Sequence, residues 1–331
     1  MADDGRTLIA FGRLFILVIG MGLAAWMDHK SRRVANQHWV KWSKPAILLW
    51  SIEILAYGGN LIILLTASAV IAYASGSVFG RPTIQDLRSG SRIDAVVFLW
   101  YGVSLLGVLY GAYLYQNTSP LDVLTGNAPI EATIWWQTLG ALVVMVLIDL
   151  AWRLRLLHGG ADAKALMWVV IVVPTWASIG TFQIIEPSDS PASLPPSFSL
   201  LMWGAFVFLL IPFIMLSRNI IKGHVKSISD LRLAWHSTIL PIQDVERRHV
   251  WLLTTTIIGG DGQEIVHHKS RAPKFTPSDD EVRAEIEKLQ QLGVDEVWVS
   301  FKIPLLVFLF PAILPLMLLG DPTGMVLSRV M

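Results

Sequence analysis

Six apolar segments, each long enough to cross a bilayer, are the main feature of this sequence. A membrane span needs about 20 mostly apolar residues, and such segments lie at residues 7–27, 95–115, 133–152, 165–185, 198–217 and 303–320. The first resembles a secretory signal, but Asp3 and Asp4 stand beside Arg6 before it, so we expect it to be retained as a membrane helix. The pattern predicts an all-α polytopic membrane protein.

Residues 36–75 are compatible with one long helix or with two helices joined at residues 58–60, Gly-Gly-Asn. Charge decides between them, because cytoplasmic loops are enriched in Lys and Arg. The flanking segments 28–44 and 76–94 are both basic, so both should face the cytoplasm, which requires an even number of crossings between them. We therefore predict two helices here and about eight in all, with seven as the alternative.

One long polar stretch, residues 218–302, has the pattern of a small α/β domain. Two runs rich in strand-forming residues, 249–258 and 263–268, flank a Gly-Gly-Asp-Gly turn and predict a hairpin. Ser278 with Glu281 is the sequence of a helical capping box, and Gly293 is a helix stop. Residues 294–300 predict a last strand.

These patterns divide the chain into three parts. Residues 1–217 form a transmembrane core, residues 218–302 a cytoplasmic α/β domain, and residues 303–331 the last span with an external tail.

Composition narrows the possible functions. Hydrophobic residues make up 53% and charged residues 15% of the chain, against roughly 25% charged residues in soluble proteins. The 26 Lys and Arg residues are balanced by 25 Asp and Glu residues, so no basic excess is available to bind nucleic acid. The chain has no Cys, which excludes disulfides, Cys-ligated zinc, iron–sulfur clusters and thiol nucleophiles. We expect no metal ion and no cofactor.

Ionisable residues at membrane depth are costly, and they usually pair. Arg13 and Glu53 fall at similar heights on successive antiparallel helices, about 22 and 25 Å above the cytoplasmic boundary at 1.5 Å per residue. Asp149 precedes Arg153 by one helical turn. We predict two structural ion pairs, Arg13 with Glu53 and Asp149 with Arg153.

Asp28 and Asp162 differ from these residues in their position. Each lies where an apolar helix meets a basic cytoplasmic loop, so both should lie at one depth on one face. If their helices are neighbours, the two carboxyl groups can share a proton, because close like charges do not both ionise cheaply. One would activate water and the other would protonate a leaving amide nitrogen. The alternative is that each carboxylate only caps or pairs at its own helix end.

The residues around these two carboxylates resemble a known family. Residues 28–36, Asp-His-Lys-Ser-Arg-Arg-Val-Ala-Asn, resemble the first motif of the type IV prepilin peptidases. Residues 158–166, His-Gly-Gly-Ala-Asp-Ala-Lys-Ala-Leu, resemble the second motif, Gly-x-Gly-Asp-x-Lys. Residues 295–304 and 218–223 are similar to the segments that border the last helices of archaeal preflagellin peptidases.

This resemblance implies an aspartic endopeptidase of the plasma membrane that removes the basic leader from prepilins or preflagellins at the cytoplasmic face. Asp28 and Asp162 would be the catalytic dyad. The residues expected to support the motifs or position the substrate are Gly159, Gly160, Lys164, Arg32, Arg33 and Asn36. Bacterial members also methylate the product and carry a Cys-rich zinc loop, which this chain lacks, so we expect proteolysis alone.

The sequence departs from the family at Ala161, where the second motif has its second glycine. A methyl group there adds bulk and disfavours positive φ. Two other functions therefore stay open. The first is an inactive membrane scaffold of pilus or archaellum assembly. The second is a small transporter with a polar pathway through Arg13, Glu53 and Asp149.

Overall fold

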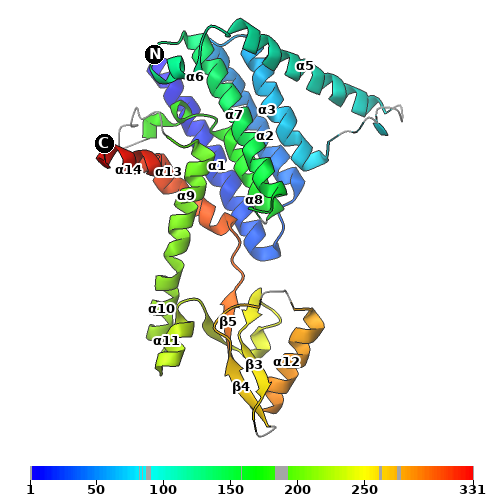
Figure 1. Cartoon of the computed structure of the whole chain (residues 1–331), viewed down its shortest axis with the longest axis vertical. Coiled ribbons are helices and arrows are strands. Elements are labelled where there is room, and N and C mark those ends of the chain that lie inside the picture. Colours follow the sequence, from blue (N-terminus) through cyan, green and yellow to red (C-terminus); the bar gives the residue numbers. More distant parts are fainter. Residues whose placement is uncertain are drawn as a thin grey trace. The chain divides into compact units, whose positions relative to one another are not determined.

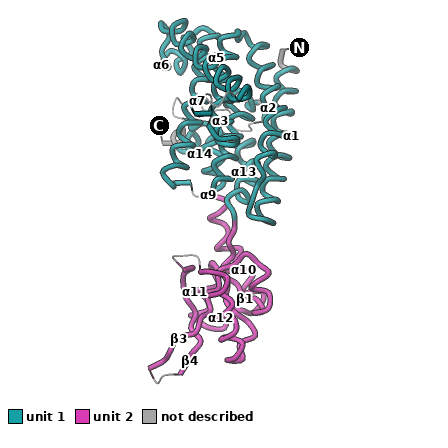
Figure 2. The backbone as a smooth tube through the Cα atoms, turned by 90° about the vertical axis from the view of Figure 1, so that its right-hand side faces the viewer, with its two compact units in different colours: residues 1–205, 304–331 teal, residues 206–303 magenta. Residues whose placement is uncertain are grey.

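The computed structural model describes residues 2–81, 83, 85–86, 91–157, 159–182, 193–260, 263–273 and 277–330. His158 of the second motif, Asp261 and Gly262 of the expected hairpin turn, and the end of the span expected at 165–185 lie outside the described residues. Two compact units make up the chain (Figure 2). One comprises Met1–Ala205 with Pro304–Met331, and the other comprises Phe206–Ile303.

The first unit is helical (Figure 1). Its helices are α1 (Ala2–Ser31), α2 (Asn36–Ala56), α3 (Leu61–Phe79), α5 (Arg92–Leu114), α6 (Pro120–Leu124), α7 (Ile130–Arg153), α8 (Gly160–Val172), the start of α9 (Pro196–Leu209), α13 (Leu306–Leu319) and α14 (Pro322–Val330).

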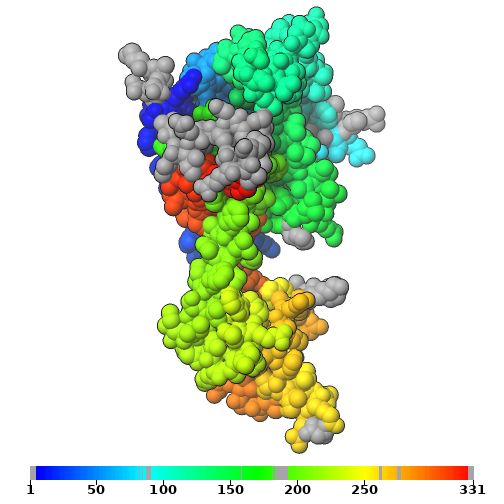
Figure 3. Space-filling view, turned by 60° about the vertical axis from the view of Figure 1, so that its left-hand side comes forward, coloured from blue at the N-terminus to red at the C-terminus, as the bar shows by residue number. Residues whose placement is uncertain are grey.

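Among the described residues, five helical segments are long and apolar enough to cross a membrane. They are Gly5–Ser31, Leu61–Phe79, Arg92–Leu114, Ile130–Arg153 and Pro196–Ile221, the last of which includes α10 (Ile211–Ile221). This last segment is drawn in yellow-green in Figure 3. Several of its apolar side chains, including Phe208 and Phe213, are more than half exposed. The chain is thus mostly helical with a small sheet region, and its long apolar helices are those of a membrane protein.

The break predicted at residues 58–60 is confirmed, because α2 and α3 are separate helices. The predicted count of eight spans is not confirmed, since α2 is not among the five candidate spans of the described residues. Gly58 takes a φ of +91°, which favours glycine. The side chain of Asn60 caps α3 by accepting hydrogen bonds from the backbone N–H groups of Ile62 and Ile63, at 3.0 and 3.2 Å.

The span predicted at residues 165–185 is wrong as one continuous helix. α8 ends at Val172, and two 3₁₀ turns follow, Trp176–Ser178 and Gly180–Phe182. The cause is Pro174, because a proline excludes the residue before it from the helical region, and Val173 is accordingly non-helical. Nine of the 13 residues of α8 are buried. The helix is therefore apolar because it packs inside the protein, which is usual for apolar helices too short to span a bilayer.

The Phe206–Ile303 unit contains two antiparallel sheets. The first has the order β1 (Thr238–Pro241), β5 (Glu296–Phe301), β2 (Val250–Leu252), and the second is the hairpin of β3 (Thr254–Ile258) and β4 (Glu264–His268). The helices are α10, α11 (Ile228–Ala234) and α12 (Asp279–Gln291).

Most of the sequence pattern of this unit is confirmed. The hairpin forms, although residues 250–252 leave it and pair with β5, with Trp251 opposite Ser300. Ser278 and Glu281 make the predicted capping box at the start of α12. Ile286 and Leu289 on α12 pack into a core with residues of β5. Burial of this helical face stabilises the small sheet.

Candidate active site

The packing of α1 against α8 sets the position of both motif aspartates. A side chain at Gly20 on α1 would lie 2.6 Å from the ring of Trp168 on α8, so only glycine allows this approach. Farther back on α1, Arg13 donates a hydrogen bond to the carbonyl of Val172. The order of these contacts shows that the helices run antiparallel. The C-terminal end of α1 and the N-terminal end of α8 therefore lie together.

Asp28 near the end of α1 and Asp162 in the first turn of α8 occupy these two ends. Asp28 is 6% exposed. Asp162 is half-buried and lies in none of the five candidate membrane-spanning helices. Burial, and then the nearby charge of Asp28, raise the pKa of its carboxyl group to about 7. Neither carboxyl group has a hydrogen bond or an ion pair with another described residue. Two carboxyl groups with unused hydrogen-bonding capacity thus share one site.

Gly159 leaves room for the carboxyl group of Asp162. A Cβ at this position would lie 2.1 Å from Asp162 Oδ2, which is far inside contact distance. At Gly160, a Cβ would lie 3.3 Å from the ring of Trp152. The second motif therefore needs Gly159 because a side chain would displace the carboxyl group, and its φ of −92° shows that backbone freedom is not the reason.

The departure at Ala161 is compatible with this local structure. Ala161 lies in the first turn of α8, and the only described non-glycine residues with positive φ are Arg32 and Arg155. An alanine has good helix propensity. The strain expected at this position is thus absent.

A hydrogen bond joins the two motifs. Lys164 Nζ in the second motif donates to Asn36 Oδ1 in the first, at 2.8 Å. Asn36 Nδ2 donates in turn to the carbonyl of Val78 at the end of α3, at 2.8 Å. Asn36 therefore ties three helices together at the end of the bundle that carries the two aspartates.

The two arginines of the first motif take different positions. Arg32 follows the last residue of α1, and its backbone N–H donates a hydrogen bond to the carbonyl of Asp28. Its φ of +58° ends the helix at this point. Its Nε atom is buried without a partner among the described residues. Arg33 is exposed, and its side chain has no hydrogen bond or ion pair within the described part of the chain. The structure thus brings Arg32 to the site and leaves Arg33 in solvent.

The predicted pair of Arg13 and Glu53 is confirmed. Arg13 is completely buried and forms an ion pair with Glu53, while it also donates to the carbonyl of Val172. Ser178 Oγ donates to the same oxygen of Glu53 at 3.2 Å. These contacts hold α1, α2 and the end of α8 together.

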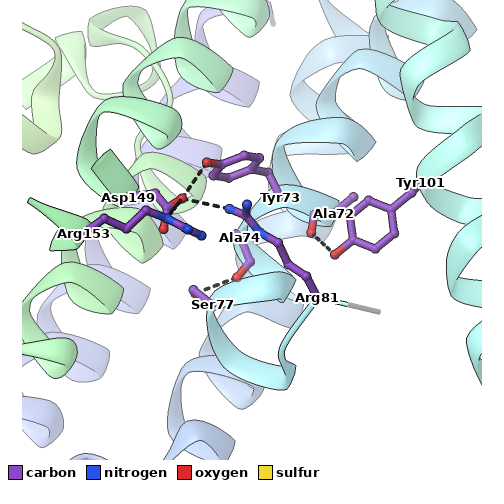
Figure 4. Close-up of polar contacts among 8 residues, drawn as sticks. All are labelled: Ala72, Tyr73, Ala74, Ser77, Arg81, Tyr101, Asp149 and Arg153. Atoms are coloured by element: carbon purple, nitrogen blue, oxygen red, sulfur yellow. Dashed lines mark hydrogen bonds and ion pairs between the residues drawn. The ribbon is translucent and has the colours of Figure 1, made fainter. Parts of the chain in front are cut away.

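The predicted pair of Asp149 and Arg153 is also confirmed, at 2.9 Å, but it is part of a larger cluster (Figure 4). Tyr73 Oη and Arg81 Nη2 bind the same carboxylate oxygen, at 2.7 and 2.8 Å. The spacing of four residues revealed Arg153, whereas no sequence signal identifies Tyr73 and Arg81, which come from a different helix and the loop that follows it.

The remaining polar residues that the structure describes either stabilise the fold through hydrogen bonds or are too far apart to bind a metal ion. Asn219, near the end of α10, is fully buried and donates to the carbonyls of Ala234 and Ser237, at 2.9 and 2.7 Å. It therefore holds α10 against the end of α11 and the segment that follows it. In the described part of the chain, no three His, Cys, Asp or Glu residues gather closely enough to hold a metal ion.

No protein-family model matches the chain, and no curated protein matches its sequence.

Proposed function

We propose that this protein is a membrane aspartic endopeptidase that resembles the archaeal branch of the type IV prepilin peptidases. The observation that carries the proposal is the pairing of Asp28 with Asp162. These carboxyl groups come from residues more than 130 positions apart in sequence and interact electrostatically, and neither has a hydrogen-bonding partner among the described residues. Carboxyl groups that serve only structure are normally paired or hydrogen-bonded when buried.

The raised pKa of Asp162 suggests how the two groups divide the reaction. At neutral pH, about half of Asp162 carries a proton. Ionised Asp28 accepts a proton from water as the water oxygen attacks the carbonyl carbon of the substrate. Protonated Asp162 then donates its proton to the amide nitrogen as the carbon–nitrogen bond breaks. Because the groups interact, the two pKa values belong to the pair in solution.

The substrate follows from the resemblance. It is a prepilin or preflagellin whose basic leader lies at the cytoplasmic face of the plasma membrane while its apolar segment stays in the bilayer. The hydrogen bond between Lys164 and Asn36 supports the proposal, because it joins the two motifs that carry the aspartates. The helical backbone at Ala161 supports an active enzyme, since the methyl group fits there without strain.

The test is cleavage of a purified prepilin or preflagellin by the detergent-solubilised protein, followed by the shift to mature size. Asp28→Asn and Asp162→Asn should each lower the rate by about 10³-fold or more, because each removes one proton-transfer group. Asp94→Asn, in the first turn of α5, is the matched control and should cleave at the wild-type rate.

Cleavage that persists in both dyad variants would refute the proposal. Absence of cleavage by folded wild-type protein, across several leaders, would favour the inactive scaffold. Reversion of Ala161 to Gly would then show whether the methyl group is responsible.

A further inference from the structure

Two arginines and one carboxylate meet where α3 and α7 end (Figure 4). Arg81 Nη2 and Arg153 Nε both donate to Asp149 Oδ2, at 2.8 and 2.9 Å. Two guanidinium groups thus share one carboxylate, and Arg155 lies two residues beyond Arg153. The cluster therefore keeps a net positive charge after its internal pairing.

Arg81 and Arg153 are held in place before any ligand binds. The guanidinium of Arg81 lies over the ring of Tyr73, 4.7 Å from its centroid. Gly76 makes space for this arrangement, because a Cβ there would lie 2.9 Å from Arg81 Cγ. Asp149, which orients both guanidinium groups, is only 5% exposed. A preorganised site loses less conformational entropy when it binds its ligand.

Hydrogen-bond donors of the cluster remain available on the surface. The side chains of Arg81 and Arg153 are 48% and 58% exposed. Arg153 uses one nitrogen for Asp149, and Arg81 forms hydrogen bonds with Asp149 and with the hydroxyl of Tyr73. The described residues provide no acceptor for the remaining N–H groups. Forked guanidinium groups with free N–H donors match the geometry of a phosphate.

Two cavities of about 460 and 330 Å³ lie at this cluster. Both are lined by Asp149, Trp152 and Arg153; Arg155 borders the first and Arg81 the second. Each has enough volume for a phosphate group with its attached glycerol. The charge of these cavities disfavours the basic leader of the proposed substrate and favours an anion.

The neighbouring residues indicate where that anion comes from. Leu154 and Leu156 alternate with the arginines and are 61% and 72% exposed, and Trp152 lies at the same end of α7. Aromatic residues are enriched at the membrane interface, and basic pockets between membrane helices bind anionic headgroups. We propose that Arg81, Arg153 and Arg155 bind the phosphate of an anionic phospholipid, with Leu154 and Leu156 against its acyl chains.

For the test, the full-length protein is reconstituted with phosphatidylglycerol or with phosphatidylcholine and then transferred to detergent. Native mass spectrometry measures how much lipid the protein retains. Wild type should retain phosphatidylglycerol selectively. Retention should fall about fivefold for each of Arg153→Gln and Arg155→Gln. Arg92→Gln, an exposed arginine at the start of α5, is the matched control and should behave as wild type.

The outcomes separate a lipid site from its alternatives. An equal loss in Arg92→Gln, or no loss in the variants of the cluster, would overturn the proposal. Inorganic phosphate at millimolar concentration should compete less strongly than phosphatidylglycerol vesicles. Equally strong competition would show that the site binds free phosphate and would overturn the assignment to a lipid. Arg155→Gln separates lipid binding from folding, because Arg155 forms no ion pair with Asp149 or with any other described residue, so its loss breaks none of the contacts that hold the cluster. None of these measurements depends on peptidase activity.

Discussion

Two pairs of carboxylates in the helical unit differ in their surroundings. Glu53 and Asp149 are fully engaged, since Glu53 binds Arg13 and Ser178, and Asp149 binds two arginines and a tyrosine. Asp28 and Asp162 have no such partners among the described residues and act on each other. The comparison separates carboxylates that hold the helices together from carboxylates that remain available for chemistry.

The difference is energetic as well as geometric. A buried charge with a partner is stable in place, and removal of that partner leaves an uncompensated ion. Two carboxyl groups that lie close together without cations destabilise the folded state when both are ionised. Such unfavourable arrangements are concentrated at functional sites. Mutations around Glu53 and Asp149 should therefore lower the stability of the protein, whereas mutations around Asp28 and Asp162 should lower its activity.

The largest effect on stability is expected when Arg13 is replaced by Met. Glu53 would then be left as a charge without its cation, at a cost of about 3–5 kcal/mol in the free energy of unfolding. Denaturant unfolding in detergent micelles measures this change. Asp162→Asn should leave the free energy of unfolding unchanged or raise it, because it removes a charge that burial disfavours.

Two controls sharpen this contrast. Arg92→Met, at an exposed position, should change the free energy by less than about 0.5 kcal/mol. The double variant Arg13→Met with Glu53→Met should recover much of the loss, since both charges are gone. A single variant as stable as wild type would show that the buried pair does not hold α1 and α2 together.

The next effect is expected at Gly159. Its replacement by Ala would bring a methyl group against Asp162 Oδ2 and push the carboxyl group out of position. Displacement of a reacting group by about 1 Å costs about 10²-fold in rate, so kcat should fall while KM changes little. Gly140→Ala is the matched control, because no atom lies within 4 Å of a Cβ at that helical position. Full activity in Gly159→Ala would separate Asp162 from the reaction.

The effect of pH on the cleavage rate should be smaller than that of Gly159→Ala, but it tests the role of Asp162 directly. Because the pKa of Asp162 is raised to about 7, the protonated acid is lost as pH rises above 7, and the rate should fall about tenfold per unit beyond it. Rate profiles of kcat between pH 5 and 9 measure this. A rate that stays constant up to pH 9 would contradict the role of Asp162 as the acid.

Stability has a related dependence on pH. The folded state binds the proton of Asp162 more tightly than the unfolded chain, whose carboxyl group has its ordinary pKa near 3.8. The free energy of unfolding should therefore decrease as pH rises from about 4 to 7 and then level off. Asp162→Asn should lose this contribution, which thermal unfolding across that pH range would detect.

The sequence predicted local features well because they depend on neighbouring residues. The α2–α3 turn follows from Gly58 and Asn60, and the capping box of α12 follows from Ser278 and Glu281. The pair of Arg13 and Glu53 followed from helix geometry and the cost of burying charge. The end of α8 was missed although Pro174 marks it, because a continuous apolar run masked the break.

Contacts between distant segments were not accessible in the same way. Tyr73 and Arg81 reach Asp149 only because α3 packs beside α7, and no spacing in the sequence reports that packing. Likewise, the motifs identified Asp28 and Asp162, but the approach of α1 to α8 through Gly20 and Trp168 depends on the folded bundle.

The smallest predicted effect concerns Lys164, which is at the edge of the site. Its hydrogen bond to Asn36 is partly exposed to solvent, and such a bond contributes about 1 kcal/mol, or about fivefold in an equilibrium. Lys164→Met should therefore lower kcat about threefold to tenfold by loosening the contact between the motifs, with the pH profile unchanged. Asn36→Asp should retain most of the rate, since a carboxylate still accepts the bond. A shifted pH profile in Lys164→Met would instead mean that the lysine acts on the charge of the aspartates directly.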